Sequence, residues 1–179
     1  MRLREKYKKE IAPKMTDGFG YNNLLAVPKL TKVVINSSVG RNAKDKNFID
    51  GVASSLERIS GQKPIMTKAK QAISAFKTRK GMIIGVAVTL RGQRMFDFTE
   101  KLVNITFPRI RDFRGLSAQQ VDNRGNLAVG FKEHMAFPEI KADEVDNIHG
   151  LQVCLTTTAK TYEEGLALFK LLGFPFKHE

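Results

Sequence analysis

Residues 58–96 read RISGQKPIMTKAKQAISAFKTRKGMIIGVAVTLRGQRMF, and they contain no Asp or Glu. The basic residues among them number nine: Arg58, Lys63, Lys68, Lys70, Lys77, Arg79, Lys80, Arg91 and Arg94. A basic, acid-free segment that is punctuated by Gly and joined to an apolar strand is typical of a surface that meets a polyphosphate. The simpler alternative is a solvated charged loop, but such a loop normally interleaves acidic residues.

The end of this stretch, Ile83–Arg91, is the clearest strand in the chain. Alternation gives it one strongly apolar face: Ile84, Val86, Val88 and Leu90. The opposite face holds smaller side chains and ends in polar ones: Ile83, Gly85, Ala87, Thr89 and Arg91. A ligand could approach this second face closely.

The chain before this stretch predicts a β-α-β unit. We expect a strand at Lys32–Val39, a helix at Asp45–Ser60 that Gly61 ends, and a short strand at Lys63–Thr67. In the first strand, Val33 and Ile35 share the apolar face. At the N-terminus, apolar residues spaced by four predict a basic amphipathic helix over residues 2–12 that Pro13 closes.

The chain after the stretch predicts two more helices around a hairpin and a last strand. The buried stripe of a helix at Gln93–Phe107, stopped by Pro108, is expected to hold four residues: Met95, Phe98, Leu102 and Ile105. Turn residues 122–126 predict a hairpin whose second arm Pro138 ends. A strand at Leu151–Thr158 follows, and Thr161 and Glu164 form a capping-box pattern before a helix at Tyr162–Leu172.

This order predicts an α+β fold: a split β-α-β (ferredoxin-like) antiparallel sheet with helices on one face, plus an N-terminal helix and an inserted hairpin. We expect residues 1–179 to form a single domain. The other sheet face would stay open. Its candidate residues are small or polar: Asn36, Ser38, Thr89, Arg91, Thr156 and Thr158. Such a face, joined to a basic loop, is a plausible RNA platform.

Composition agrees with an anionic partner. The 179 residues carry a net charge of +12 and a sequence pI near 9.9. No apolar run approaches the roughly 20 residues that span a bilayer, and the basic N-terminus lacks the apolar core of a secretory signal. Cys154 is the only cysteine, which excludes an internal disulfide. We therefore expect a cytoplasmic protein that does not bind a membrane.

The charge is uneven along the chain. Residues 133–164 contain seven acidic residues against two basic ones, Lys141 and Lys160. The acidic residues are Glu133, Glu139, Asp143, Glu144, Asp146, Glu163 and Glu164. This asymmetry suggests two surfaces, one for RNA and one for a basic partner protein.

The sequence offers no active site and no cofactor motif. Both glycine-rich phosphate-binding patterns are missing, and the three histidines lack metal-ligand spacing. A Cys154–His149 nucleophile pair is formally possible, but a structural cysteine on a sheet face is the better interpretation. An enzyme acting on RNA would need a carboxylate or histidine cluster, so we expect no catalysis.

Three features keep alternatives open. Phe76 in the basic loop either anchors the loop in the core or stacks on a base or ribose. Ser and Thr on strands are ordinary residues there, whereas Asn36 among β-branched residues favours a hydrogen-bonding role. The basic segment after the predicted helix, with Arg109, Arg111 and Arg114, is either solvated or in contact with phosphate.

Several longer motifs resemble the bacterial large-subunit ribosomal protein number five, a 5S ribosomal RNA-binding family, nearly end to end. They are Gly61–Pro64, Thr67–Lys70, Val88–Gly92, Pro108–Ser117, Phe137–Ile140, Thr156–Lys160 and Gly173–Phe176. Two stretches depart from the usual family pattern. Within Asn36–Gly40 the departures affect local contacts only, since Asn36 and Gly40 are kept, and the changes in Val121–Leu127 leave the role of the hairpin tip open.

The resemblance implies a structural protein of the central protuberance that attaches 5S RNA to the large subunit, where 23S ribosomal RNA and other central-protuberance proteins are its neighbours. The family positions for 5S RNA correspond to Asn36, Gln62 and Thr89, with Arg91 beside them. We add Ser38 and Lys63 to the expected 5S RNA-binding residues. A loop over residues 72–81 would reach the peptidyl-site tRNA through Ala72, Ser74, Phe76, Lys77, Thr78, Arg79, Lys80 and Gly81. A bridge to small-subunit protein thirteen would use Arg109, Arg111, Arg114, Asp143, Glu144 and Asp146. A translation factor that uses the same fold outside the ribosome is the remaining alternative.

Overall fold

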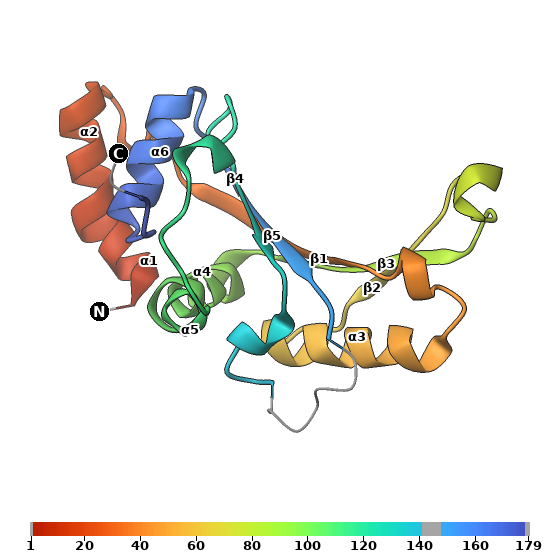
Figure 1. The fold of residues 1–179 in the computed structure, drawn as a ribbon. Helices are drawn as coiled ribbons and strands as arrows, with labels where there is room; N and C mark the ends of the chain where they lie inside the picture. The colour runs from red at the N-terminus through yellow and green to blue at the C-terminus, as the bar shows by residue number, and fades with distance from the viewer. Residues whose placement is uncertain (1, 141–147, 178–179) are drawn as a thin grey trace. The chain divides into compact units, whose positions relative to one another are not determined.

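The computed structural model describes residues 2–140 and 148–177 (Figure 1). The chain folds into two compact units. The terminal unit contains residues 1–33, 90–129 and 154–179, and the central unit contains residues 34–89 and 130–153. The predicted single domain is not tested by this division and stays a prediction.

Five strands form one sheet in the order β2-β3-β1-β5-β4. Their bounds are β1 Leu30–Ser38, β2 Ile65–Lys68, β3 Ile83–Leu90, β4 Leu127–Phe131 and β5 Leu151–Thr157. Strand β2 runs antiparallel to β3, which separates it from β1. Helix α3, Lys46–Ser60, connects β1 to β2. This is the split β-α-β arrangement, and it confirms the predicted α+β fold.

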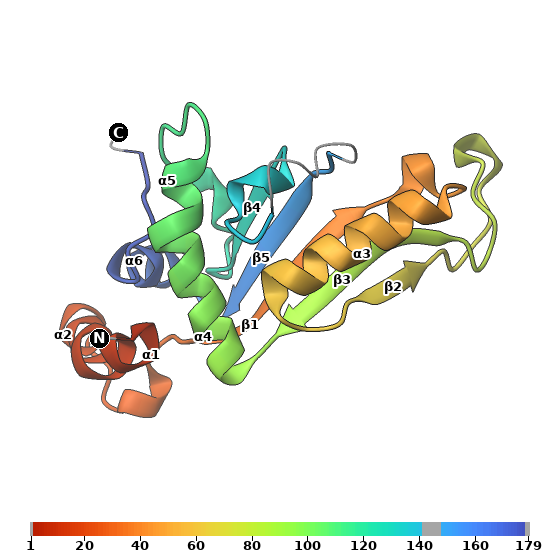
Figure 2. The same ribbon diagram turned by 90° about the horizontal axis from the view of Figure 1, so that it is seen from below.

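Helix α3 covers one face of the sheet in the central unit (Figure 2). Asp45 caps its N-terminus by accepting a hydrogen bond from the Phe48 backbone N–H at 3.2 Å. Its buried stripe consists of Ile49, Val52, Leu56 and Ile59. In β1 the odd positions from Val33 to Ser37 are buried, while Asn36 and Ser38 are exposed. Burial of the apolar sides of α3 and the strands leaves the polar side of the sheet in solvent.

The terminal unit contains the remaining long helical segments. The first comprises α1 Leu3–Lys6, a π-helical turn Tyr7–Ile11 and α2 Ala12–Phe19. The second comprises α4 Gly92–Lys101, a π-helical turn Leu102–Thr106 and α5 Phe107–Arg109. Helix α6 spans Tyr162–Leu171. The predicted capping box is confirmed: Thr161 accepts from the Glu164 N–H at 3.3 Å, and the Glu164 carboxylate accepts in return from the backbone N–H of Thr161. The carboxylate also accepts from the Lys160 N–H at 2.8 Å.

The prediction that Pro13 and Pro108 end their helices is wrong. In both places a five-residue π-helical turn comes first, and the proline is the second residue of the α-helical segment that follows. A proline inside an α-helix lacks an N–H and clashes with the carbonyl four residues earlier. The wider turn removes that conflict, since proline is tolerated in the first turn of a helical segment.

The second π-helical turn also corrects the predicted buried stripe. Ile105 is 43% exposed, whereas Thr106 and Phe107 are buried. A turn that closes five residues back, from the Phe107 N–H to the Leu102 carbonyl, rotates the following side chains relative to a regular 3.6-residue pattern. The stripe therefore continues through Leu102 to Thr106.

The turn of the inserted hairpin is confirmed, but its arms meet in a single antiparallel bridge and its first arm is not a strand of the sheet. Val121 and Leu127 form only an isolated antiparallel bridge, and β4 pairs with β5 in the sheet. The turn is held by Asp122, which accepts hydrogen bonds from the N–H groups of Arg124 and Asn126 at 2.9 and 2.7 Å. Short 3₁₀ turns complete the described chain: Leu24–Ala26, Gly40–Asn42, Ser74–Phe76, Ala118–Gln120 and His134–Ala136.

The same turn packs tightly inside the terminal unit. The Thr157 hydroxyl donates to the Gly125 carbonyl at 2.7 Å. A Cβ placed on Gly165 of α6 would overlap the Cα of Gly125 and lie 2.7 Å from its carbonyl oxygen. Both glycines are therefore required by close backbone contact. The core of this unit also contains stacked and edge-on rings of Phe107, Phe113, Phe169 and Phe174.

Candidate nucleic-acid interface

The open face of the sheet in the central unit is polar. We call it the polar face and define it by the exposed residues Asn36 and Ser38 of β1, Thr67 of β2, Thr89 of β3 and Gln152 of β5. The register, which pairs Thr67 with Gly85 and Ile65 with Ala87, places these small residues on the same side as Thr89. The predicted exposure of Asn36, Ser38 and Thr89 is thus confirmed.

Gln62 is held beside this face. It follows the C-terminal end of α3, and its side-chain amide donates to the Thr89 carbonyl at 3.3 Å. The bond fixes one amide group at the end of β3 and leaves the amide oxygen of Gln62 able to accept from a ligand. Lys63 is exposed next to it in the chain.

The small size of Gly85 suggested that a ligand could approach the strand closely there, but the space beside Gly85 is not open. It is buried, and a Cβ on it would meet the Thr67 hydroxyl oxygen at 2.7 Å and the Asn36 amide oxygen at 3.6 Å. Gly85 therefore makes room for these two side chains. Their polar atoms, rather than the backbone of β3, form the surface that a ligand meets here.

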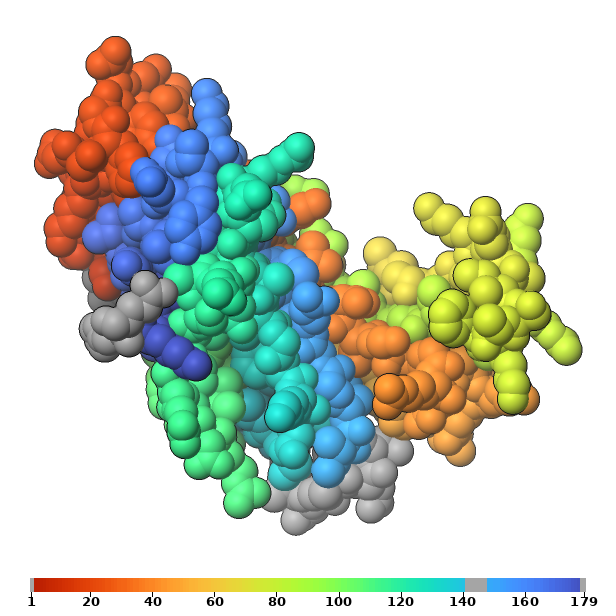
Figure 3. Space-filling view, turned by 45° about the horizontal axis from the view of Figure 1, so that its top comes forward, coloured from red at the N-terminus to blue at the C-terminus, as the bar shows by residue number. Residues whose placement is uncertain are grey.

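The connection from β2 to β3 is a short hydrogen-bonded ribbon, which we call the basic loop, residues 69–82. Backbone bonds join Ala69 with Met82 at 2.8 Å and pair Ile73 with Thr78 at 3.2 Å in both directions. At its tip Lys77 adopts a left-handed conformation with φ of 52°. In the space-filling view the loop, drawn in yellow-green, stands out from the rest of the central unit (Figure 3).

Phe76 lies at this tip and is 75% exposed. The alternative in which it anchors the loop in the core is therefore wrong. The other predicted contact residues of the loop are exposed as well, except Thr78, which is half-buried. A hollow of about 830 Å³ beside the loop is lined in part by three cations: Lys44, Lys77 and Arg79. Cations around a hollow next to an exposed aromatic ring suit phosphate and base contacts.

The remaining candidate residues lie elsewhere. Arg91 belongs to the terminal unit, where it is exposed and precedes α4. Arg109, Arg111 and Arg114 are also exposed in that unit. Asp143, Glu144 and Asp146 lie outside the described residues.

Two threonines of the predicted open face, Thr156 and Thr158, belong to the terminal unit. Thr156 is half-buried, and its carbonyl accepts from the Thr31 hydroxyl at 3.0 Å. Thr158 follows the end of β5, and its hydroxyl accepts from the Lys29 N–H at 3.0 Å. Both residues therefore lie outside the polar face as defined for the central unit.

Burial raises the pKa of the half-buried Cys154 thiol, which keeps it protonated and unreactive at neutral pH. Within residues 2–140 and 148–177, no group of three or more His, Cys, Asp or Glu is placed to hold a metal ion. Across the same ranges, no helix combines the length and the apolar character needed to cross a membrane.

The predicted site omitted four residues: Thr67 and Gln152 of the polar face, and Arg41 and Asn42 at its border. The register of β2 puts Thr67 on this side, but a strand of four residues is too short for the alternation of its side chains to predict which face each one takes. Arg41 and Asn42 lie in a 3₁₀ turn after β1, where no periodicity predicts a direction. The available signal was that Arg41 and Asn42, a long cation and an amide, follow shortly after Ser38, which was predicted to lie on the open face.

Comparison with known proteins gives a consistent result over the whole chain. A family model for ribosomal protein L5 matches residues 23–79, and one for the C-terminus of the same ribosomal protein family matches residues 83–176. A large ribosomal subunit protein uL5 from Caldanaerobacter subterraneus subsp. tengcongensis is 52% identical over 175 residues, 98% of each chain. Proteins of the same name from Thermoanaerobacter sp. (strain X514) and Halothermothrix orenii are 51% and 50% identical, over 98% and 97% of both chains.

Proposed function

The chain belongs to the ribosomal protein L5 family, whose members are structural components of the large ribosomal subunit and not enzymes, and we propose that it binds 5S ribosomal RNA through the polar face of its central unit. In this proposal the protein attaches 5S RNA in the central protuberance, next to 23S RNA and the neighbouring proteins. The protein would then be located in the large ribosomal subunit, in the cytoplasm.

The observation that carries the proposal is the side-chain arrangement at β1 and β3. Asn36 and Ser38 are exposed on the polar face, and Gln62 is held at Thr89 by its 3.3 Å hydrogen bond. Amide and hydroxyl groups both donate and accept, so they suit base edges and ribose hydroxyls. Lys63 and, in the terminal unit, Arg91 are exposed cations suited to the phosphate backbone.

The basic loop supports a second contact, with the peptidyl-site tRNA. Its cations Lys77, Arg79 and Lys80 are exposed around the exposed ring of Phe76. The backbone hydrogen bonds in the stem of the loop restrain it and so lower the entropy lost when the tip binds. A bridge to small-subunit protein thirteen, through the region of Arg109, Arg111 and Arg114 and the acidic residues near 143–146, completes the proposed set of partners.

The test is a titration of the purified protein against 5S RNA, with tRNA as competitor, at 50 and 200 mM salt. If the protein contacts six to ten phosphates, raising the salt concentration over this range should lower its affinity roughly a thousandfold or more. We expect the preference for 5S RNA to survive at the higher salt, because hydroxyl and amide contacts are less screened than charge contacts. Asn36→Ala should reduce that preference.

A different result would reject the proposal. If 5S RNA and tRNA bind alike and are both released by salt, the chain is a general polyanion binder. If the protein stays unbound to large subunits in sedimentation at every salt concentration, a factor acting outside the ribosome explains it better.

A further inference from the structure

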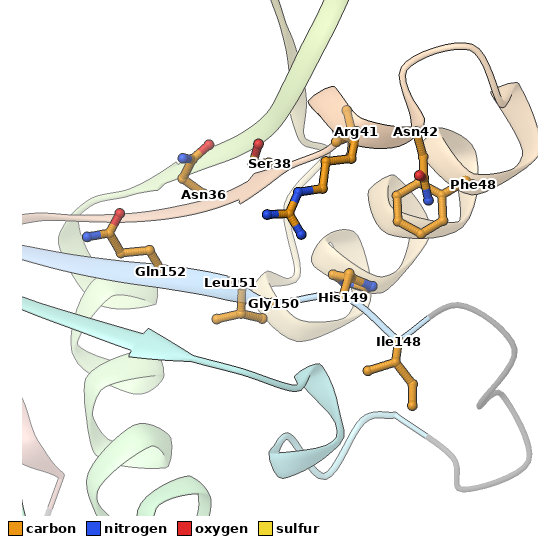
Figure 4. Close-up of a pocket in the computed structure, with 11 residues that line it drawn as sticks. Asn36, Ser38, Arg41, Asn42, Phe48, Ile148, His149, Gly150, Leu151 and Gln152 are labelled. Atoms are coloured by element: carbon orange, nitrogen blue, oxygen red, sulfur yellow. The ribbon is translucent and has the colours of Figure 1, made fainter. Parts of the chain in front are cut away.

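A hollow of about 550 Å³ opens at one end of the polar face (Figure 4). It lies entirely in the central unit, where the end of β1, the turn Gly40–Asn42, the start of α3 and the start of β5 contribute to its wall. The volume is in the range of sites that hold a small ligand. None of the described residues that line it is acidic.

Three kinds of side chain among those that line this hollow are suited to a nucleotide. Arg41 is exposed, and in Figure 4 its guanidinium reaches over the end of the strands. The amides of Asn36, Asn42 and Gln152 are exposed donors and acceptors from three different segments. The ring of Phe48 is half-buried and supplies the aromatic surface. One cation, several amides and one ring match the parts of a nucleotide: a phosphate, a base edge and a base plane.

The arrangement favours an unpaired nucleotide over a duplex. Proteins recognise RNA sequence mainly in unstacked bases, whose planes stack on aromatic side chains and whose edges form hydrogen bonds. A paired base offers neither its plane nor its Watson–Crick edge to a hollow. Because Asn36 lies both on the polar face and in the wall of the hollow, an RNA on the face would pass the entrance.

We propose that this hollow takes one unpaired nucleotide, turned out of the RNA that lies on the polar face, with its phosphate at Arg41 and its base against Phe48. The inference rests on the proposed function, since it requires RNA on that face. It adds a specific site, a stacking residue and an anion-binding residue, none of which belongs to the predicted contact set.

The first experiment uses the four 5′-mononucleotides as probes and the full-length, ¹⁵N-labelled protein. We expect millimolar binding that shifts the side-chain amide signals of Asn36, Asn42 and Gln152, and we expect Arg41→Gln to abolish these shifts. Arg79→Gln is the matched control, because it removes the same charge from the basic loop outside the hollow. Shifts confined to the basic loop, or equal loss in both variants, would overturn the site.

The second experiment measures the affinity for intact 5S RNA. Phe48→Leu should reduce it roughly five- to hundredfold, the range for one stacked base. Phe48→Tyr keeps the ring plane and should bind like the wild type, and thermal unfolding shows whether either variant is folded. If Phe48→Leu binds normally while Asn36→Ala weakens binding, the face binds RNA and the hollow does not hold a base. If the wild type has no preference for 5S RNA, both the proposed function and this inference fail.

Discussion

The two units use their small and polar residues in opposite ways. In the terminal unit Gly125, Gly165 and Thr157 are consumed by contacts inside the protein, where backbone meets backbone. In the central unit Asn36, Thr67 and Thr89 face solvent, and the room that Gly85 provides is taken by exposed side chains. The residues of the terminal unit are needed to stabilise the fold, whereas stability does not explain why the exposed polar residues of the central unit are present. Substitutions in the two units should therefore change different measured quantities.

The largest expected effect is on the stability of the terminal unit. In Gly165→Ala the new Cβ would overlap the backbone of Gly125, which no side-chain rotation relieves. We expect the free energy of unfolding to fall by about 3 kcal/mol, the upper range for overpacking. Denaturant unfolding measures it. Gly18→Ala in α2 is the matched control, because a Cβ there meets nothing within 4 Å, and it should be neutral or slightly stabilising. Equal effects in both variants would contradict the close contact.

The next effect is on binding by the basic loop. Replacing Lys77, Arg79 and Lys80 together with Ala should lower tRNA affinity about tenfold or more at 50 mM salt and reduce the salt slope by two to three. The melting temperature should not change, because all three side chains are exposed. Arg109, Arg111 and Arg114 changed to Ala remove the same charge from the terminal unit. If this control weakens tRNA binding as much, net charge and not the loop is responsible. If the loop variant loses 5S binding instead, the loop and the polar face do not have separate partners.

A smaller effect is expected at Gln62, which combines an internal bond with a predicted RNA contact. Gln62→Ala should weaken 5S binding roughly fivefold, equivalent to about 1 kcal/mol for one lost hydrogen bond. Its stability should fall by less than about 0.5 kcal/mol, because the side chain is half-exposed. Equilibrium binding and thermal unfolding of the same samples test both numbers. A large loss of stability with unchanged binding would place Gln62 among the structural residues.

The smallest effect concerns acid stability in the terminal unit. Partial desolvation alone would raise the pKa of Asp122, but hydrogen bonds from Asn126 and Arg124 outweigh it and hold that pKa below its ordinary value. A carboxyl whose pKa is lowered by folding stabilises the protein above its unfolded pKa and loses this effect as pH falls through the folded pKa. From about pH 5 down to about pH 2, unfolding free energy should fall less steeply in Asp122→Asn than in the wild type. Parallel curves would show that the turn does not depend on this charge.

The sequence was a good guide where a repeating pattern met a local stop signal. Helix α3 and strand β3 lie within one residue of their predicted bounds, because a regular buried stripe or an alternating face ends at Gly61 or Gly92. The same alternation correctly predicted that the side chains of Asn36, Ser38 and Thr89 are exposed. These positions depend only on the period of the backbone.

The errors have a common physical cause in tertiary structure. Pro13 and Pro108 lie within helical segments because each follows a π-helical turn, and a 3.6-residue period cannot reveal that turn. Strand β4 pairs with β5, a choice that turn residues do not encode. In the proposed binding surface, the direction of Arg41 and the exposure of Phe76 depend on how a turn and a ribbon are held, so the composition of the sequence does not predict them.

Strand β2 has a consequence for the protein before it meets RNA. It forms an edge of the sheet, and it exposes Ile65 by 69% and Met66 by 37%. Such an edge is a template for pairing with another chain, and nearby lysines oppose this by mutual repulsion. Lys63, Lys68 and Lys70 are all exposed here. We expect these charges to oppose aggregation of unassembled copies, so free protein made in excess of RNA should become less soluble as salt rises.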